Sequence, residues 1–336
     1  NLYRFNWLIL YLFGSSPILT KGFIKESQKE LIKIDNETFY MPYGTSLRMS
    51  EYGYCNPIRS NLQVSINSLD EYISDLHKAV STYCSDYKNS LIEDETAKQI
   101  SQNILQIDDE YYAIARAKSN SISDESTIKK LSSGGVDFIE LRSLDLNPFS
   151  PIGIDLETTL FLETLMLFCL INEDGEISKS ESQTITSNDR IVSKFGRKPK
   201  IMLKKDSKEI LLTEWGKQII DSLYPIADLL DSELYSYTKA ISAMSKKLDN
   251  PELTISGRLL DDFFFKNKSY SDYGITVAES NKKFFSKLDI KQNKNWDKLV
   301  SEADESLRKQ KDMEKSPDSS FEDFLNEYFE RNYSEL

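Results

Sequence analysis

Residues 134–146, GGVDFIELRSLDL, constrain the fold most strongly, because their alternating pattern predicts a β-strand. Successive side chains of a strand point to opposite faces of the sheet. One face would therefore carry Val136, Phe138, Glu140 and Arg142. An acid and a guanidinium on the same face can form a solvated ion pair, or they can line a polar site. The spacing alone leaves both interpretations open.

A second strand with a polar face is predicted at residues 103–118, NILQIDDEYYAIARAK. Its alternation places on one face Glu110, Tyr112, Ile114 and Arg116. Residues 119–135 are polar and predict a loop that contains one short helix. Two strands that present acid, phenol and guanidinium together predict a polar sheet wall rather than a core face.

A wall of this kind suits phosphoryl transfer to a carboxylate. Mg²⁺ takes oxygen ligands, and the migrating phosphoryl group needs fixed positive charge around its oxygens. Glu140 fits the first requirement and Arg142 fits the second. Upstream, the loop MPYGTSLRMSEYGYCNP contains Arg48 and Tyr54, and a guanidinium there suits an amino-acid carboxylate. An exposed arginine on a surface loop is the alternative.

Helical patterns dominate the second half of the chain, after an earlier helix at residues 69–83 with Ser68 as its N-cap. Residues 156–171 predict an apolar helix with Asp155 as its N-cap. Further helices are expected at residues 213–224, 226–248, 277–288 and 321–329. Pro225 should end or kink the first of these, and the last should dock back on the body through its apolar face.

These patterns predict an α+β fold in two parts of one unit. Residues 1–155 form the sheet-bearing part, and residues 156–336 form the mainly helical part. The seven-residue apolar run from Trp7 to Phe13 is too short to span a bilayer, which needs about 20 apolar residues. We therefore expect this run to be a buried helix rather than a leader or a membrane span.

Charge and composition exclude several functions. The net charge of −12 disfavours binding to nucleic acid or to an anionic membrane, although a few converging basic side chains could still hold a nucleotide. His77 is the only histidine and lies in a polar helical pattern, which argues against Ser-His-Asp and Cys-His catalysis. The three cysteines lack metal-site or redox spacing, so a reducing cytoplasm is the expected compartment.

Several longer motifs occur in one order along the chain. They are YLFGSSP at 11–17, MPYGTSLRMSEYGYCN at 41–56, NILQIDDEYYA at 103–113, FIELRSLDLNPFSPIGID at 138–155, GRKP at 196–199 and LTISGRLL at 253–260. Together they closely resemble the bacterial glutamate-cysteine ligases of the proteobacterial type, over nearly the whole chain. The resemblance is to the C-terminal two-thirds of such an enzyme.

The resemblance implies a glutamine synthetase-like fold, in which an antiparallel sheet lines a funnel and helices surround it. It implies ATP-dependent ligation of the glutamate γ-carboxyl to the cysteine amine through a γ-glutamyl phosphate, the first step of glutathione biosynthesis, with ATP and Mg²⁺. By position it implies these roles: Glu140 binds Mg²⁺, Arg142 acts at the reacting centre, Arg48 binds a substrate carboxylate, Tyr54 and Tyr112 line the cysteine pocket, and Arg116 and Lys118 lie near the nucleotide.

The family's N-terminal part carries most of the acidic metal ligands and does not occur in this sequence, so we expect the chain alone to be inactive. Two alternatives stay open: a ligase of the same fold that uses another amine, and a non-catalytic fragment that only binds ligand. The expected partners are the small molecules L-glutamate and L-cysteine, with no nucleic acid and no membrane, and the expected state is a cytoplasmic monomer.

Overall fold

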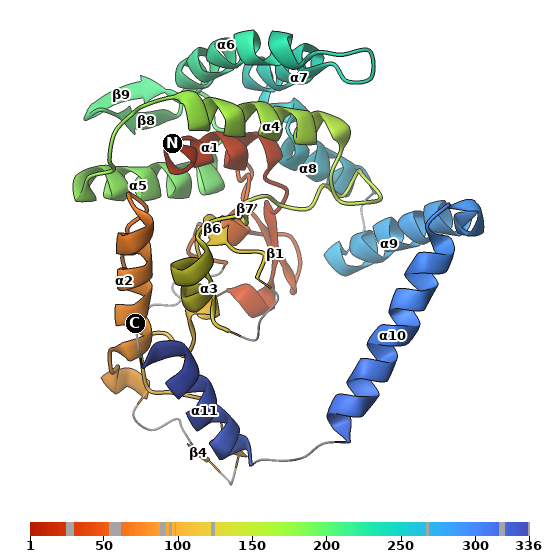
Figure 1. Ribbon diagram of the computed structural model, residues 1–336. Coiled ribbons are helices and arrows are strands. Elements are labelled where there is room, and N and C mark those ends of the chain that lie inside the picture. The colour runs from red at the N-terminus through yellow and green to blue at the C-terminus, as the bar shows by residue number, and fades with distance from the viewer. Residues whose placement is uncertain are drawn as a thin grey trace.

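The computed structural model describes residues 1–24, 30–53, 62–87, 92–93, 96–97, 99–121, 125–266, 269–315 and 320–334 (Figure 1). Its α-helices are α1 (Leu2–Phe13), α2 (Leu69–Ser81), α3 (Thr127–Gly134), α4 (Leu156–Ile171), α5 (Lys179–Phe195), α6 (Leu212–Leu230), α7 (Tyr237–Asp249), α8 (Ile255–Lys266), α9 (Tyr270–Ser286), α10 (Trp296–Glu314) and α11 (Phe321–Tyr333). Its strands are β1 (Ile18–Thr20), β2 (Ile32–Lys33), β3 (Thr38–Tyr40), β4 (Ile92–Glu93), β5 (Thr96–Ala97), β6 (Ala115–Lys118), β7 (Phe138–Leu141), β8 (Met202–Lys205) and β9 (Lys208–Leu211).

Helix α1 lies at the centre of the main core, as the apolar run predicted. Every residue from Trp7 to Phe13 is at most 1% exposed. Helices α4, α5 and α8 contact α1, and α6 and α7 pack over α4 in the next layer (Figure 1). Burial of apolar surface on this scale is the main favourable contribution to folding, so α1 anchors the helical layers. No helix in the described ranges is long and apolar enough to cross a membrane.

The predicted N-caps of two helices are confirmed. The Ser68 side chain accepts a hydrogen bond from the Glu71 backbone N–H at the start of α2. The Asp155 carboxylate accepts one from the Thr158 backbone N–H at 2.7 Å at the start of α4. These bonds satisfy donors that the first helical turn leaves unpaired, and this is why short polar residues mark helix starts in a sequence.

The helix predicted at residues 213–224 is longer than expected, and Pro225 does not end it. Helix α6 continues through Pro225 to Leu230, and the chain turns at residues 231–236 before α7. Leu223 and Ala227, on either side of the proline, are fully buried. Continuing the helix keeps both side chains in the core, and this packing offsets the backbone bond that proline cannot form.

The sheets are small and antiparallel, so the fold is α+β with helices predominating. β3 pairs with both β1 and β2, and separate two-stranded ribbons are formed by β4–β5, β6–β7 and β8–β9. In the β6–β7 ribbon, Arg116 faces Glu140 and Lys118 faces Phe138. These pairs fix which side chains can share a face of the ribbon.

The two predicted strands are much shorter than expected, and the polar face proposed for residues 110–116 is not a strand face. Glu110 lies in the 3₁₀ helix η4 (Asp108–Glu110), and Tyr112 precedes β6. Asp108 is 3% exposed and accepts a hydrogen bond from the Ile128 N–H of α3 at 2.7 Å. This contact turns the chain toward α3, a tertiary constraint that the local alternation does not encode.

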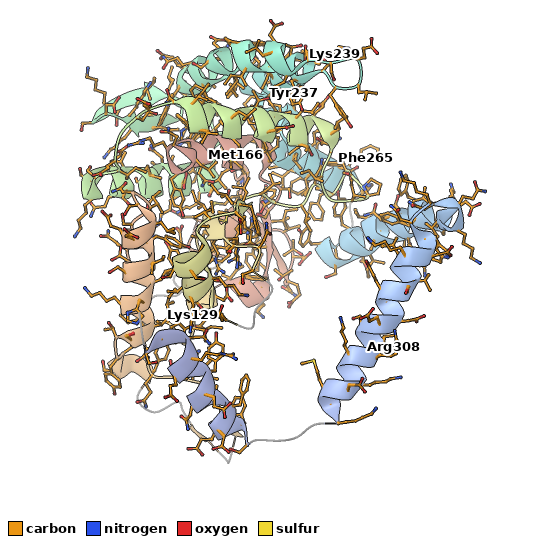
Figure 2. The ribbon with its side chains drawn as sticks, in the orientation of Figure 1. Lys129, Met166, Tyr237, Lys239, Phe265 and Arg308 are labelled. Carbon is orange, nitrogen blue, oxygen red and sulfur yellow. The ribbon has the colours of Figure 1, made fainter. Side chains whose placement is uncertain are left out.

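The C-terminal helices leave the body and return to it. α10 stands apart as an arm, while α11 lies beside α3 (Figure 1). Lys129 of α3 lies close to α11 and donates to the Arg331 carbonyl at 2.7 Å (Figure 2). The Tyr333 hydroxyl donates to Asp108 Oδ1 at 2.9 Å. The prediction that the last helix docks back on the body is therefore confirmed. The helix expected at residues 277–288 is present as α9, which begins earlier, at Tyr270, and ends at Ser286.

Removing the Tyr333 hydroxyl should weaken the docking of α11. Tyr333→Phe leaves Asp108 buried without this partner, and we expect a loss of about 1–3 kcal/mol in the free energy of unfolding. Urea unfolding measures the loss, and Tyr83→Phe, at a side chain that is 53% exposed, is the control. Equal stability of the two variants would contradict the structural role of the Tyr333–Asp108 contact.

Asp189 should make stability depend on pH. Its Oδ2 accepts from Asn6 Nδ2 at 2.8 Å, and its Oδ1 is shielded from solvent without a partner. Burial raises the pKa of Asp189 from 3.8 to about 7. The folded state thus holds the proton more tightly than the unfolded state, so this carboxyl destabilises the protein increasingly as the pH rises from 4 to 7.

Asp189→Asn removes this titration, and its stability gain over the original chain should be larger at pH 8 than at pH 5. Urea unfolding at the two pH values measures the difference. Asp221→Asn, at an exposed position of α6, should show no such trend. A gain for Asp189→Asn that is the same at both pH values would rule out the proposed titration.

Candidate active site

Three of the predicted site residues come together although they are distant in sequence. Arg48 lies in the 3₁₀ helix η2 (Leu47–Met49), Tyr112 lies just before β6, and Arg142 lies just after β7. Arg48 Nη1 donates to the Tyr112 hydroxyl at 2.6 Å, and the Arg142 guanidinium lies over the Tyr112 ring, 4.9 Å from its centroid. Tyr112 is therefore the common contact of the two arginines.

The backbone next to β7 sets the position of Arg142. Its N–H donates to the Ile114 carbonyl at 2.8 Å, which continues the β6–β7 pairing by one bond. Its side chain is half-buried and makes no hydrogen bond or ion pair with any residue that the structure describes. Stacking on a tyrosine ring orients a guanidinium while leaving its donors available to an anion.

Asp145 completes this group and was not predicted from the sequence. Its side chain is 4% exposed, and its Oδ1 accepts from Arg48 Nε at 2.6 Å. The Nη2 of Arg48 donates to the carbonyls of Arg142 and Leu144, both at 3.1 Å. Asp145 stands three residues after Arg142 in the motif that carried the strand prediction, but the sequence contains no signal that distinguishes it from a solvated aspartate.

The predicted metal ligand Glu140 lies on the β6–β7 ribbon, opposite Arg116. Its half-buried carboxylate makes no hydrogen bond or ion pair with the described residues. The described part of the chain contains no cluster of three His, Cys, Asp or Glu side chains that could hold a metal. Glu140 can thus contribute one oxygen ligand to Mg²⁺, which commonly keeps several waters and takes further oxygens from phosphates.

The predicted nucleotide residues Arg116 and Lys118 are both held by Asp109. Arg116 is 6% exposed, and its guanidinium donates to the Asp109 carboxylate at 3.2 Å and to the Asp109 and Tyr111 carbonyls. Lys118 Nζ lies 3.4 Å from the same carboxylate. Burial would raise the pKa of Asp109, but Lys118, Thr127 and Arg116 together lower it below its usual value. A nucleotide role for this pair stays a prediction.

A cavity of about 1110 Å³ borders the arginine group. Met49 and Tyr112 contribute to its wall together with residues of α5 and of the segment 62–67, whereas neither Arg48 nor Arg142 lines it. Tyr112 therefore contacts both this cavity and the two guanidinium groups. Tyr54, the second tyrosine predicted for the cysteine pocket, lies outside the described residues, as does Cys55.

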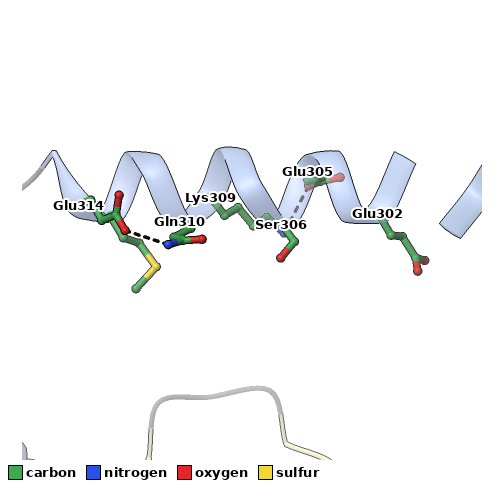
Figure 3. A pocket seen from close by; sticks show the side chains of 7 residues that line it. Glu302, Glu305, Ser306, Lys309, Gln310 and Glu314 are labelled. Atoms are coloured by element: carbon green, nitrogen blue, oxygen red, sulfur yellow. Dashed lines mark hydrogen bonds and ion pairs between the residues drawn. The ribbon is translucent and has the colours of Figure 1, made fainter. Parts of the chain in front are cut away.

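The hollow along α10 is a different kind of feature (Figure 3). All its lining side chains come from that one helix, where Gln310 donates to Glu314 at 2.8 Å and Lys309 lies 3.2 Å from Glu305. These are helix-surface pairs at a spacing of four residues, which contribute only a few tenths of a kcal/mol each. The hollow offers no enclosed space and no group for catalysis.

Comparison with known proteins connects this geometry to one family. The family model described as "Glutamate-cysteine ligase" matches residues 1–192. A glutamate–cysteine ligase of Pseudomonas fluorescens Pf-5 is 32% identical over 331 residues, which cover 98% of this chain and 62% of the relative. One from Pseudomonas entomophila is 34% identical over 333 residues, with the same coverage. The chain thus spans about 62% of the length of these curated relatives.

Solved structures agree. The glutamate–cysteine ligase of Francisella tularensis, in complex with AMP, superposes with a TM-score of 0.90 at 28% identity, covering 98% of this chain and 66% of that one. A bifunctional glutathione synthetase from Pasteurella multocida superposes over 84% of this chain with a TM-score of 0.59 at 20% identity, which shows a shared fold only. The family match over residues 1–192 includes Arg48, Tyr112, Glu140 and Arg142. The chain therefore belongs to the glutamate-cysteine ligase family.

Proposed function

We propose that the chain forms the substrate-activating part of an ATP-dependent ligase that joins the γ-carboxyl of L-glutamate to the amine of L-cysteine, the first step of glutathione biosynthesis. The observation that carries the proposal is the Arg142 guanidinium, stacked on Tyr112 and without a carboxylate partner among the described residues, at the edge of a family-matched site. The AMP bound to the Francisella tularensis relative supports a nucleotide site.

In this reaction ATP transfers its γ-phosphoryl group to the glutamate γ-carboxylate, and the cysteine amine then displaces phosphate from the γ-glutamyl phosphate. Arg142 would bind the phosphoryl oxygens as charge develops on them, and the Tyr112 ring keeps its guanidinium in place. Both groups are fixed before substrate binds, so little reorganisation accompanies the reaction.

Recognition of the amino-acid substrate is assigned to Tyr112 and the residues around it. We assign Arg48 to a substrate carboxylate, and Tyr112 with Tyr54 to the wall of the cysteine pocket, because an aromatic ring and a hydroxyl suit a small thiol-bearing molecule. The cavity of about 1110 Å³ beside Tyr112 has room for such a substrate. Arg116 and Lys118 would contribute positive charge toward the nucleotide from the neighbouring strand.

Glu140 is the residue that we assign to Mg²⁺, since its carboxylate has no other described partner and lies on the same ribbon as Arg116. When bound, Mg²⁺ would neutralise charge on the phosphates.

The β6–β7 ribbon would form part of the wall of a glutamine synthetase-like funnel, with residues 1–155 as the sheet-bearing part and 156–336 as the helical part. A cytoplasmic monomer is the remaining part of the proposal, consistent with free Cys84 and Cys169.

The substrate test uses two preparations, this chain alone and the chain fused behind the N-terminal part of a full-length relative. Each is assayed for ADP and γ-glutamylcysteine with ATP, glutamate and cysteine, and for binding of MgATP and glutamate. Replacing cysteine by a panel of other amines separates the proposed ligase from one of the same fold with another substrate. Binding in both preparations with turnover in neither would favour a non-catalytic fragment. Absence of both binding and turnover in the fused preparation would refute the proposal.

In the preparation that turns over, Arg142→Ala should lower kcat by about 10²–10³-fold, the usual cost of losing one donor to a developing oxyanion. Arg142→Lys should recover little, because an ammonium cannot reproduce the planar, stacked guanidinium. Arg308→Lys, on the α10 arm (Figure 2), is the control and should leave kcat unchanged. Normal turnover of Arg142→Ala would exclude the assigned role.

Glu140→Gln should weaken the Mg²⁺ dependence of nucleotide binding, since an amide oxygen is a poorer ligand than a carboxylate. Calorimetric titration of ATP at several Mg²⁺ concentrations should show a midpoint raised on the order of tenfold. Glu209→Gln, a carboxylate on the separate β8–β9 ribbon, should leave the midpoint unchanged. Identical midpoints for the two variants would remove Glu140 from the metal site.

A further inference from the structure

The Asp145 carboxylate uses its two oxygens for two different segments of the chain. Oδ2 accepts from the Ser15 backbone N–H and from the Ser16 hydroxyl, both at 2.8 Å. Oδ1 accepts from Arg48 Nε at 2.6 Å. With its side chain 4% exposed, Asp145 is held in one orientation by the serines and presents the other oxygen to Arg48.

Gly14 explains how Ser15 and Ser16 reach Asp145. A Cβ atom at position 14 would lie 2.5 Å from the Leu10 carbonyl oxygen and 2.6 Å from the Thr45 carbonyl carbon. Only glycine therefore permits the end of α1 to approach the loop at Thr45 this closely. The motif YLFGSSP, conspicuous in the sequence but without an assigned role, thus brings two hydrogen-bond donors from the buried helix to the aspartate.

Arg48 connects Asp145 to the other residues of the candidate site. Its Nη1 donates to the Tyr112 hydroxyl, and its Nη2 donates to the Arg142 and Leu144 carbonyls. One planar guanidinium thus joins Asp145 to the tyrosine under Arg142 and to the backbone that follows β7. Because the guanidinium is rigid, fixing its Nε edge also fixes where the two Nη groups point.

We propose that Asp145 is a positioning residue for amino-acid recognition: with Ser15 and Ser16 it locks Arg48, and through Arg48 it sets the position of Tyr112. The inference rests on the proposed function for the identity of the substrate, but the Asp145–Arg48 geometry stands independently of it. Asp145 itself would touch neither substrate nor nucleotide. Its loss should therefore weaken binding of cysteine while leaving binding of MgATP nearly unchanged.

The informative variant is Asp145→Asn. Its amide oxygen can still accept from Ser15 and Ser16, whereas its NH₂ group would oppose the Arg48 Nε–H with a second donor. The substitution thus removes the contact to Arg48 and preserves the anchor to α1. Glu181→Gln is a matched control, because Glu181 forms a comparable pair with Arg4, at 2.5 Å, between α5 and α1.

Calorimetry gives the functional readout on whichever of the two preparations described above binds cysteine. Asp145→Asn should weaken cysteine binding by about tenfold to a hundredfold, the range for loss of a charge-assisted contact. Its MgATP affinity should match that of the original protein, and Glu181→Gln should change neither affinity. An unchanged cysteine affinity for Asp145→Asn, or an equal loss of cysteine and MgATP affinity, would overturn the proposal.

A second readout does not depend on any substrate. In protein labelled with ¹⁵N at arginine Nε, the Arg48 Nε–H, assigned by its absence in Arg48→Lys, should exchange slowly with solvent because a buried carboxylate binds it. Its signal should shift and exchange faster in Asp145→Asn, but not in Glu181→Gln. An Arg48 signal that Asp145→Asn leaves unchanged refutes the positioning role. If the signal responds but no preparation binds cysteine, the proposed function fails and the Asp145 contact stands.

Discussion

The ion pair between Arg48 and Asp145 is the interaction on which the geometry of the candidate site depends. It joins η2 to the segment that follows β7, and Asp145 is tied in turn to the end of α1 through Ser15 and Ser16. A nearly buried carboxylate is stable only when its charge and lone pairs are satisfied, and here the partners come from two other parts of the chain, the Ser15–Ser16 segment and Arg48. The site is therefore positioned by the core helix and not by the sheet alone.

Prediction from the sequence succeeded where the signals are local, and it failed where contacts between distant residues decide the structure. The positions of α1, α2 and α4 followed from their sequences, because a continuous apolar run and the capping residues Ser68 and Asp155 are local signals. The lengths of the strands did not, because β6 and β7 occupy only part of the predicted ranges and the chain at 103–118 is interrupted where Asp108 turns toward α3. The helix break was misplaced at Pro225 because burial of Leu223 and Ala227 outweighs the missing N–H.

For the candidate site, the family motifs supplied the residues but not their contacts. Arg48 and Tyr112 are 64 positions apart and meet through a hydrogen bond that no spacing rule anticipates. Asp145 was missed because an aspartate in a polar segment has no pattern that reports burial. The alternation that placed Glu140 and Arg142 on one strand face was sound for β7, yet Arg142 lies beyond the strand and is oriented by Tyr112 instead.

The charge distribution reconciles an acidic chain with an anionic nucleotide. The net charge of −12 sets the long-range field, but binding depends on the positive groups that remain available inside the site. Asp109 occupies the guanidinium of Arg116 and lies near Lys118, while Asp145 and two carbonyls occupy Arg48. Among these four basic residues, Arg142 alone has an aromatic ring rather than a carboxylate beside it in the described structure. Arg142 is thus the one of the four whose guanidinium has no described carboxylate beside it, and under the proposed function it would meet the anionic groups of the substrates.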